Sequence, residues 1–282
     1  MMKIDAHHHL WRYQPAEYAW IDPESRIAHD FMGTDLAAML AKAGVGGAIT
    51  VQARQAPEET RFLIDAAQSA PILGVVGWID LRSPAIEALL EVDAHPLIVG
   101  YRHVVQDEAD NNFILSQEFI RGVRAVVARD LTYDLLVNHR QLSSVVAFVE
   151  SVGNGRFVLD HAAKPDIARG GWSPWAEDIA AVAALPNVFC KVSGLVTEAD
   201  HAGWKSDDFE RYLDHIFGLF GPERLIWGSD WPVCLLAADY GQALSLIEDY
   251  IDRHCPADRA PILGGNAIRA YALTLTERTP DP

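Results

Sequence analysis

The chain has 282 residues, which is enough for two average domains or for one α/β barrel, and half of them are hydrophobic. Its 23 lysine and arginine residues against 39 aspartate and glutamate residues give a formal net charge of −16, with no run of basic residues. This balance argues against nucleic acid and anionic membrane surfaces as partners, because both reward a basic patch. It places no constraint on a neutral small molecule.

No segment has the composition of a signal peptide or of a membrane span. The first nine residues already contain charges and three histidines, and no apolar run approaches the ~20 residues that cross a bilayer. The three cysteines, Cys190, Cys234 and Cys255, form no Cys-x-x-Cys pair, which is typical of reduced thiols in a cytoplasmic protein. We therefore expect a soluble cytoplasmic protein, with the oligomeric state left open.

Eight runs rich in valine and isoleucine have the length of short strands. In chain order they are residues 3–7, 46–52, 72–79, 97–103, 131–137, 156–161, 187–193 and 225–230. The segments between them carry apolar residues at helical spacing, such as Leu36, Met39, Leu40 and Ala43. Repeated βα units of this kind predict a single (β/α)8 TIM barrel over residues 1–282, with long βα loops at its C-terminal face.

The alternative is a doubly wound open sheet, but no glycine-rich dinucleotide fingerprint follows any predicted strand. After the eighth strand, Gly264-Gly265-Asn266 leads into a last helix at 267–273, and the polar tail 276–282 is expected to fray. No linker or repeat divides the chain, so one domain is expected.

The first strand presents two histidines on one face. Side chains alternate along a strand, so Asp5, His7, His9 and Trp11 should share a face while His8 points the other way. A buried strand has no structural need for neighbouring imidazoles. A hydrolytic site does, because imidazoles hold a metal or water, or polarise a carbonyl group.

Other predicted strands also end in polar groups, and in a barrel these ends meet at one face, where active sites lie. The second strand ends in Gln52, the sixth in His161 and the eighth in Asp230. The fourth ends in Arg102 and His103, and strand register decides which of the two faces the site. Their convergence predicts a site with Asp230 placed as a general base.

Six of the eight tryptophans lie in predicted loops on that same face. They are Trp11, Trp20, Trp172, Trp175, Trp204 and Trp231. Aromatic side chains at a barrel mouth can stack on a sugar or another ring, which makes Trp20 and Trp204 candidate substrate contacts. The alternative is that these rings only cover the mouth of the barrel.

The motifs, taken in order, resemble the amidohydrolase superfamily. His-x-His at 7–9, His161 and Asp230 within Trp-Gly-Ser-Asp-Trp-Pro carry the broad resemblance. Ile-Asp-Ala-His-His-His-Leu-Trp (4–11), Tyr-Arg-His-Val-Val-Gln-Asp-Glu (101–108) and Leu-Asp-His-Ala-Ala-Lys-Pro (159–165) resemble its sugar-lactone hydrolase branch, which is related to 2-pyrone-4,6-dicarboxylate lactonase. The resemblance extends from Asp5 to the last predicted helix.

The resemblance implies hydrolysis of a sugar lactone of the L-fuconate or L-rhamnonate type to its aldonic acid. Asp230 would act as the general base, and His7, His9 and His161 would orient water and polarise the carbonyl. The expected substrate contacts are Arg102, His103, Gln52, Trp20 and Trp204.

One departure concerns metal. Metal-dependent relatives supply a lysine or histidine from strand five, whereas this chain has Leu131-Thr132-Tyr133-Asp134-Leu135, which argues against a binuclear site. His7, His9, His161 and Asp230 could still hold one Zn²⁺, since the ligand types suit it. The resemblance to the lactonase branch implies that no metal is required.

Two alternatives stay open. One is a metal-dependent hydrolase or decarboxylase of the same superfamily that acts on a small cyclic or unsaturated acid. The other is a barrel that binds sugar acids without turnover, which a lactone hydrolysis assay would distinguish.

Overall fold

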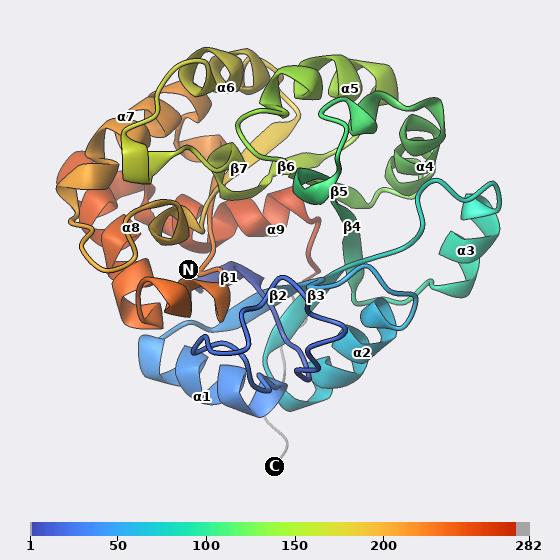
Figure 1. The fold of residues 1–282 in the computed structure, drawn as a ribbon, viewed down its shortest axis with the longest axis horizontal. Coiled ribbons are helices and arrows are strands. Elements are labelled where there is room, and N and C mark those ends of the chain that lie inside the picture. Colours follow the sequence, from blue (N-terminus) through green and yellow to red (C-terminus); the bar gives the residue numbers. More distant parts are fainter. Residues whose placement is uncertain (1, 275–282) are drawn as a thin grey trace.

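The computed structural model describes residues 2–274, so the tail at 276–282 lies outside the described residues. Eight strands surround a central axis, and helices cover their outer side (Figure 1). The strands are β1 Ile4–His8, β2 Gly47–Val51, β3 Ile72–Gly77, β4 Ile98–Val104, β5 Thr132–Leu136, β6 Phe157–Leu159, β7 Val188–Val192 and β8 Leu225–Trp227. The helices are α1 Gly33–Ala43, α2 Glu59–Ala66, α3 Ile86–Val92, α4 Gln117–Val127, α5 Val145–Val152, α6 Trp175–Ala183, α7 Asp207–Phe220, α8 Tyr240–His254 and α9 Asn266–Ala270.

All neighbouring strands pair in parallel in the order β1 to β8. The backbone then joins β1 to the segment after β8: Asp230 N–H donates to the His7 carbonyl at 2.8 Å, and His9 N–H donates to the Trp231 carbonyl at 2.7 Å. The sheet is therefore closed into a barrel. This confirms the predicted TIM barrel over the open-sheet alternative.

Several strands end one to three residues before the predicted end, and β6 and β8 do so beside unusual backbone turns. β6 stops at Leu159 and β8 at Trp227, because the backbone soon turns left-handed at His161 (φ 53°) and at Asp230 (φ 57°). No glycine occupies either position, so local composition does not signal the turns. Both turns lie at the C-terminal end of the barrel.

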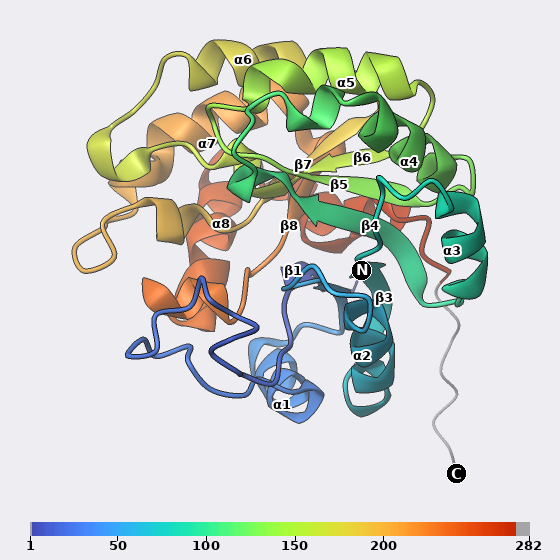
Figure 2. The same cartoon turned by 45° about the vertical axis from the view of Figure 1, so that its right-hand side comes forward.

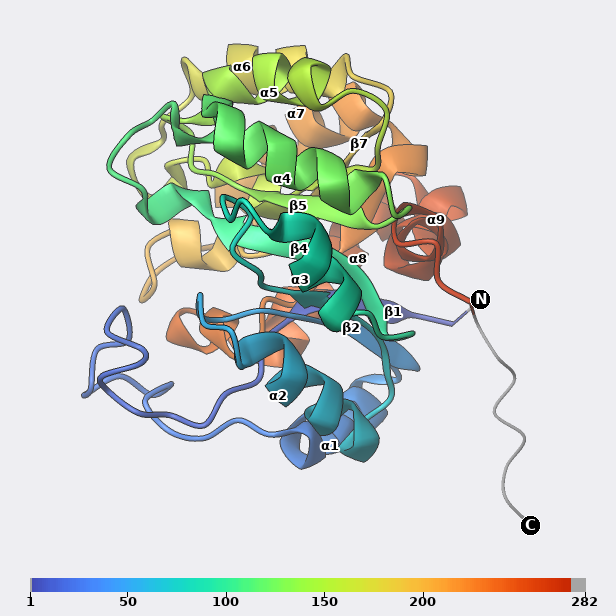
Figure 3. The same cartoon turned by 90° about the vertical axis from the view of Figure 1, so that its right-hand side faces the viewer.

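The inside of the barrel has an apolar base. Ile4, Ala6, Ile49 and Val51 pack there with Ala267, Ala270 and Tyr271, which lie in or directly after α9. α9 and the N-terminus lie at one end of the barrel, and the long loop after β1 lies at the other (Figures 2 and 3). The α9 side of the barrel is thus filled mainly by apolar side chains.

No helix among residues 2–274 is long and apolar enough to cross a membrane.

Candidate active site

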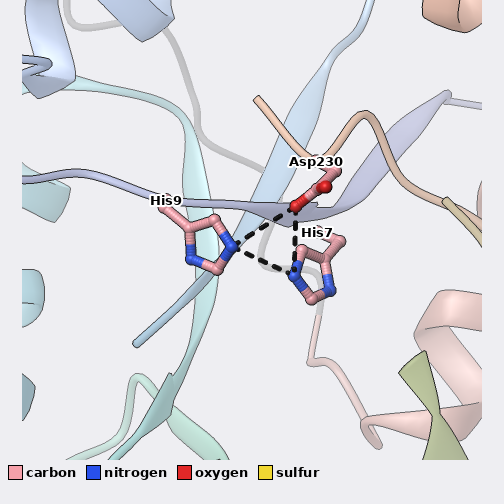
Figure 4. Close-up of side chains that lie close together, drawn as sticks. All are labelled: His7, His9 and Asp230. Atoms are coloured by element: carbon pink, nitrogen blue, oxygen red, sulfur yellow. Dashed lines mark hydrogen bonds and ion pairs between the residues drawn. The ribbon is translucent and has the colours of Figure 1, made fainter. Parts of the chain in front are cut away.

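Three predicted side chains converge at the loop end of the barrel (Figure 4). His7 Nε2 lies 3.2 Å from His9 Nε2, and Asp230 Oδ1 lies 3.4 Å from His9 Nε2 and 3.8 Å from His7 Nε2. His161 Nε2 approaches the same carboxylate oxygen at 3.9 Å. The structure thus brings together the four residues whose types first indicated a hydrolytic site, and all four are buried.

A register shift in β1 changes which side chains face this cluster. The pairing of β1 with β2 slips between Asp5 and His8, so strict alternation fails there. His7 faces the barrel interior, whereas the Asp5 carboxylate accepts hydrogen bonds from Ser229 N–H, Ser229 Oγ and Tyr240 Oη. The expectation that Asp5 shares the face of His7 and His9 is therefore wrong, because an irregular strand does not alternate.

Asp5 instead supports the backbone turn that carries Asp230. Ser229 bonds to Asp5 through both its N–H (2.9 Å) and its hydroxyl (2.6 Å), and the same hydroxyl oxygen accepts from Trp231 N–H. These bonds hold the residues on both sides of Asp230. The φ of Asp230 itself is 57°, a value that residues other than glycine seldom adopt. Burial raises the pKa of Asp5 to about 6, although the bonds from Ser229 oppose this effect.

Beneath the cluster lies a buried ion network that the motifs did not reveal. Lys191 Nζ lies 2.6 Å from Asp134 Oδ2, 2.9 Å from Asp160 Oδ1 and 3.2 Å from His7 Nδ1. Arg102 Nη1 lies 2.9 Å from Asp160 Oδ2, and none of these side chains is more than 3% exposed. The sequence contained one sign of this network, which is a charged residue inside each of two buried strands. Lys191 follows Val188-Phe189-Cys190 in β7, and Asp134 lies within Thr132–Leu136 in β5.

The neighbours of each imidazole indicate where its proton lies. The Val51 carbonyl, 2.9 Å from His9 Nδ1, can only accept, so His9 carries a proton on Nδ1. In the neutral ring, its Nε2 lone pair then faces His7 and Asp230. His7 has charged neighbours at both ring nitrogens: Lys191 Nζ (3.2 Å) and Asp160 Oδ1 (3.3 Å) at Nδ1, and Arg102 Nη1 (3.2 Å) at Nε2. Arg102 can only donate and an ionised Asp160 can only accept, so these two neighbours favour a His7 proton on Nδ1, whereas Lys191 favours one on Nε2.

Burial and nearby charge set the protonation states. Burial, together with Lys191 and His161, holds the pKa of His7 well below its ordinary value against the opposing charge of Asp160. Burial likewise lowers the pKa of His161 to about 4. Burial alone would raise the pKa of Asp230, but His161, His9 and Lys164 together bring it below its usual value. At neutral pH this gives an ionised carboxylate beside neutral His7 and His161 rings.

Two predicted substrate contacts, Gln52 directly after β2 and Arg102 on β4, bond to each other. Arg102 Nη2 donates to the Gln52 carbonyl at 2.6 Å and lies 3.3 Å from Gln52 Oε1, while Gln52 Nε2 donates to the Arg102 carbonyl. Both side chains are buried. His103 faces away from the cluster, where it bonds Glu108 at 2.8 Å and stacks on Phe113. Strand register therefore directs Arg102 inward and His103 toward the helices.

The tryptophans mostly cover the barrel. Trp11, Trp175 and Trp231 are buried, and Trp175 begins α6 instead of lying in a loop. Trp204 donates its indole N–H to the Ala237 carbonyl at 2.8 Å and packs on Phe209. Trp20 is 48% exposed and meets the edge of Trp11. Of these five rings, Trp20 alone keeps a large exposed aromatic surface.

The donor set is also compatible with one metal ion. His7 Nε2, His9 Nε2 and Asp230 Oδ1 are separated by 3.2 to 3.8 Å. Ligand atoms about 2.0–2.1 Å from a tetrahedral zinc ion lie at similar separations from one another. The Val51 carbonyl fixes the His9 tautomer as a metal ligand requires. A His7 proton on Nδ1, where Asp160 Oδ1 lies 3.3 Å away, would likewise leave His7 Nε2 free to ligate zinc.

Comparison with known proteins gives consistent matches along the chain. A profile described as amidohydrolase matches residues 4–273. L-fucono-1,5-lactonases from Burkholderia multivorans and Burkholderia ambifaria are 42% and 40% identical to the chain, and each alignment covers 96% of both proteins. A crystal structure of an amidohydrolase from Burkholderia multivorans with bound zinc has a TM-score of 0.93 at 42% identity, covering 97% of this chain and 100% of that one. These matches confirm the resemblance that the motifs indicated.

We predict that Lys191→Met lowers the free energy of unfolding by about 3–5 kcal/mol, because Asp134 and Asp160 lose their shared cation in the barrel interior. Methionine keeps much of the stem volume, so the loss reports on charge. Lys3→Met is the matched control: it breaks a surface ion pair with Glu248 and should cost less than about 1 kcal/mol. Urea unfolding at pH 7 measures both, and equal midpoints for the two variants would contradict the prediction.

Proposed function

Because the chain belongs to the amidohydrolase family, we propose that it hydrolyses a sugar lactone to the corresponding aldonic acid. The observation that carries this proposal is a single carboxylate, Asp230, within 3.9 Å of three imidazoles at the loop end of the barrel. The relatives named L-fucono-1,5-lactonase support a lactone of the L-fuconate or L-rhamnonate type as the substrate.

In the proposed reaction Asp230 takes a proton from water as the water oxygen attacks the lactone carbonyl. The lowered pKa of Asp230, to which the neighbouring histidines contribute, keeps this base ionised at neutral pH. The C–O bond to the ring oxygen then breaks, and the proton held by Asp230 passes to that oxygen to form the hydroxyl of the product. Water and lactone are consumed, and one aldonic acid is formed.

The three imidazoles take different parts. The Nε2 lone pair of His9 can accept a hydrogen bond from the attacking water, since Nδ1 holds the ring proton. His161 Nδ1 lies 2.9 Å from Ser193 Oγ, whose hydroxyl can donate to it and leave the His161 proton on Nε2. The His161 Nε2–H can donate a hydrogen bond to the oxyanion that develops on the lactone carbonyl. A positioned donor of this kind stabilises the transition state by ~3 kcal/mol. His7 holds His9 in place.

We further propose that no metal is required. Two features of the site support this. Asp134 occupies strand five, where a bridging lysine or histidine would lie, and the Arg102 guanidinium, with Nη1 3.2 Å from His7 Nε2, would repel a cation bound at that nitrogen. Lactones are activated acyl groups, so strong carbonyl polarisation is not essential. If Zn²⁺ binds, His7, His9 and Asp230 would hold it, and it would supply Lewis-acid polarisation of the carbonyl.

A panel of five- and six-membered sugar lactones tests the proposed function. Each turnover releases one acid proton, which a pH indicator follows directly. We expect turnover of L-fucono- or L-rhamnono-lactone and little turnover of 2-pyrone-4,6-dicarboxylate, because Arg102 is already paired with Asp160 and Gln52. Hydrolysis of the dicarboxylate with no activity on any sugar lactone would reject the assignment.

Asp230→Asn keeps the shape of the side chain but removes the base. We predict a fall in kcat of at least ~10²-fold with an unchanged circular dichroism spectrum. His103→Asn is a useful comparison, because His103 faces Phe113 outside the site and its loss should leave kcat within a few-fold of the parent. Near-normal turnover by Asp230→Asn would remove this residue from the mechanism.

Activity should survive prolonged chelation followed by dialysis, with metal content checked by elemental analysis. We expect the chelated protein to keep most of its kcat and added Zn²⁺ to change it little. Loss of activity on chelation that Zn²⁺ restores would instead establish a mononuclear metal enzyme and reopen the decarboxylase alternative.

A further inference from the structure

Two charged side chains near the cluster have unused hydrogen-bonding capacity. Lys164 and Glu198 have side chains that are 25% and 23% exposed, and Lys164 Nζ lies 3.8 Å from Glu198 Oε1. That separation is an ion pair but too long for a direct hydrogen bond. Within residues 2–274 neither charged group makes a side-chain hydrogen bond to the protein. Arg102 and Gln52, by contrast, are buried and bonded to each other.

Lys164 lies beside the proposed reaction centre because of an unusual backbone turn. His161, Ala162, Ala163 and Lys164 have φ values of 53°, 47°, 56° and 52°, which is a left-handed turn without glycine. Within the turn, Lys164 N–H donates a hydrogen bond to the His161 carbonyl. Two side chains also hold it from outside: Trp175 Nε1–H donates to the Ala162 carbonyl, and His139 Nδ1–H donates to the Lys164 carbonyl. Backbone held in such a sparsely populated region is typical of functional sites.

Glu198 lies on a second segment that approaches the same centre. It ends the short 3₁₀ turn Leu195–Glu198, directly after Gly194. A Cβ atom on Gly194 would lie 2.6 Å from His161 Nδ1 and 3.1 Å from Asp230 Oδ2, so this turn begins in contact with both residues. Thr197 Oγ donates to the Gly194 carbonyl at 2.7 Å and ties the turn together. Lys164 and Glu198 therefore extend from the two segments that enclose His161 and Asp230.

A hydroxyl group matches the gap between these two charges. It can accept a hydrogen bond from the ammonium and donate one to the carboxylate, and both bonds would be charge-assisted. The pair has no net charge, so it does not favour an anionic ligand. Burial raises the pKa of Glu198, with Lys164 opposing, as expected for a carboxylate only partly compensated by its cation. A partly exposed pair whose charged atoms are too far apart for a direct hydrogen bond adds little stability, so a structural role explains it poorly.

We propose that Lys164 and Glu198 form a subsite for a ring hydroxyl of the substrate and determine specificity for hydroxylated lactones. This inference rests on the proposed function, since the ring is that of the lactone attacked beside Asp230. Neither residue takes part in the chemical step. Their effect should therefore depend on whether the substrate carries a hydroxyl group that can reach them.

The test compares two lactones that differ in hydroxylation: the sugar 1,5-lactone that the protein prefers, and δ-valerolactone, which has no hydroxyl group. We expect Lys164→Met and Glu198→Gln each to lower kcat/KM for the sugar lactone about 10- to 100-fold, as loss of a charge-assisted hydrogen bond predicts. For δ-valerolactone, measured as a substrate or as a competitive inhibitor, kcat/KM or the inhibition constant should change less than about threefold. Lys42→Met and Glu58→Gln make the same charge changes at exposed sites in or near α1 and α2 and should leave both lactones unaffected.

The double variant adds a second readout. If one hydroxyl bridges both groups, Lys164→Met with Glu198→Gln should lose clearly less than the product of the two single losses. Equal losses on both lactones, or no loss on the sugar lactone, would overturn the subsite while leaving the lactonase assignment intact. A parent protein that hydrolyses δ-valerolactone but no sugar lactone would overturn the proposed function and the subsite together.

Discussion

The arrangement of the site depends on Lys191, a fully buried cation that is shared by two carboxylates and one imidazole. An unpaired charge at this depth would be costly, so Asp134, Asp160 and His7 must all lie within reach of the three N–H donors of Lys191. The partners come from β5, β1 and the residue that follows β6, and Arg102 on β4 adds a second cation on Asp160. The network therefore links separate sectors of the barrel through their side chains. It also reaches the apolar base, because Tyr271 Oη donates to Asp134 from the end of α9.

The protonation states of the cluster follow from the groups around each ring. The Val51 carbonyl holds the His9 proton on Nδ1, so the Nε2 lone pair of a neutral His9 ring is directed toward Asp230. Burial keeps His7 and His161 neutral. Burial also raises the pKa of Asp230, but the contacts with His161, His9 and Lys164 outweigh it and keep this carboxylate ionised. A base beside neutral donors and acceptors is what hydrolysis of an activated acyl group needs at neutral pH. The same donor geometry accommodates a zinc ion when the His7 proton lies on Nδ1, where Asp160 Oδ1 lies 3.3 Å away.

Backbone strain at the site is concentrated in two places, Asp230 and the turn from His161 to Lys164. Neighbouring side chains hold each of these positions by hydrogen bonds. Asp5 and Ser229 support the first, and Trp175 and His139 support the second. Such supports let the chain place side chains where a regular strand would not, at a local cost of about 1–2 kcal/mol per left-handed residue. The proposed hydroxyl subsite depends on the second of these turns, since Lys164 is its last residue.

The sequence alone determined the barrel, because eight apolar runs separated by amphipathic segments bury their surfaces best as closed βα units. It also predicted that His7, His9, His161 and Asp230 meet, since parallel strands end at one face. It could not predict that Arg102 points inward and His103 outward, because one residue of register reverses every side chain. Nor could it predict that Asp5 leaves the face of His7, since a bulge depends on pairing with β2. Lys191, Asp134 and Asp160 are far apart along the chain, and only closure of the barrel makes them neighbours. Local sequence specifies periodicity and strand ends, whereas tertiary packing decides register, strain and the pairing of buried charges.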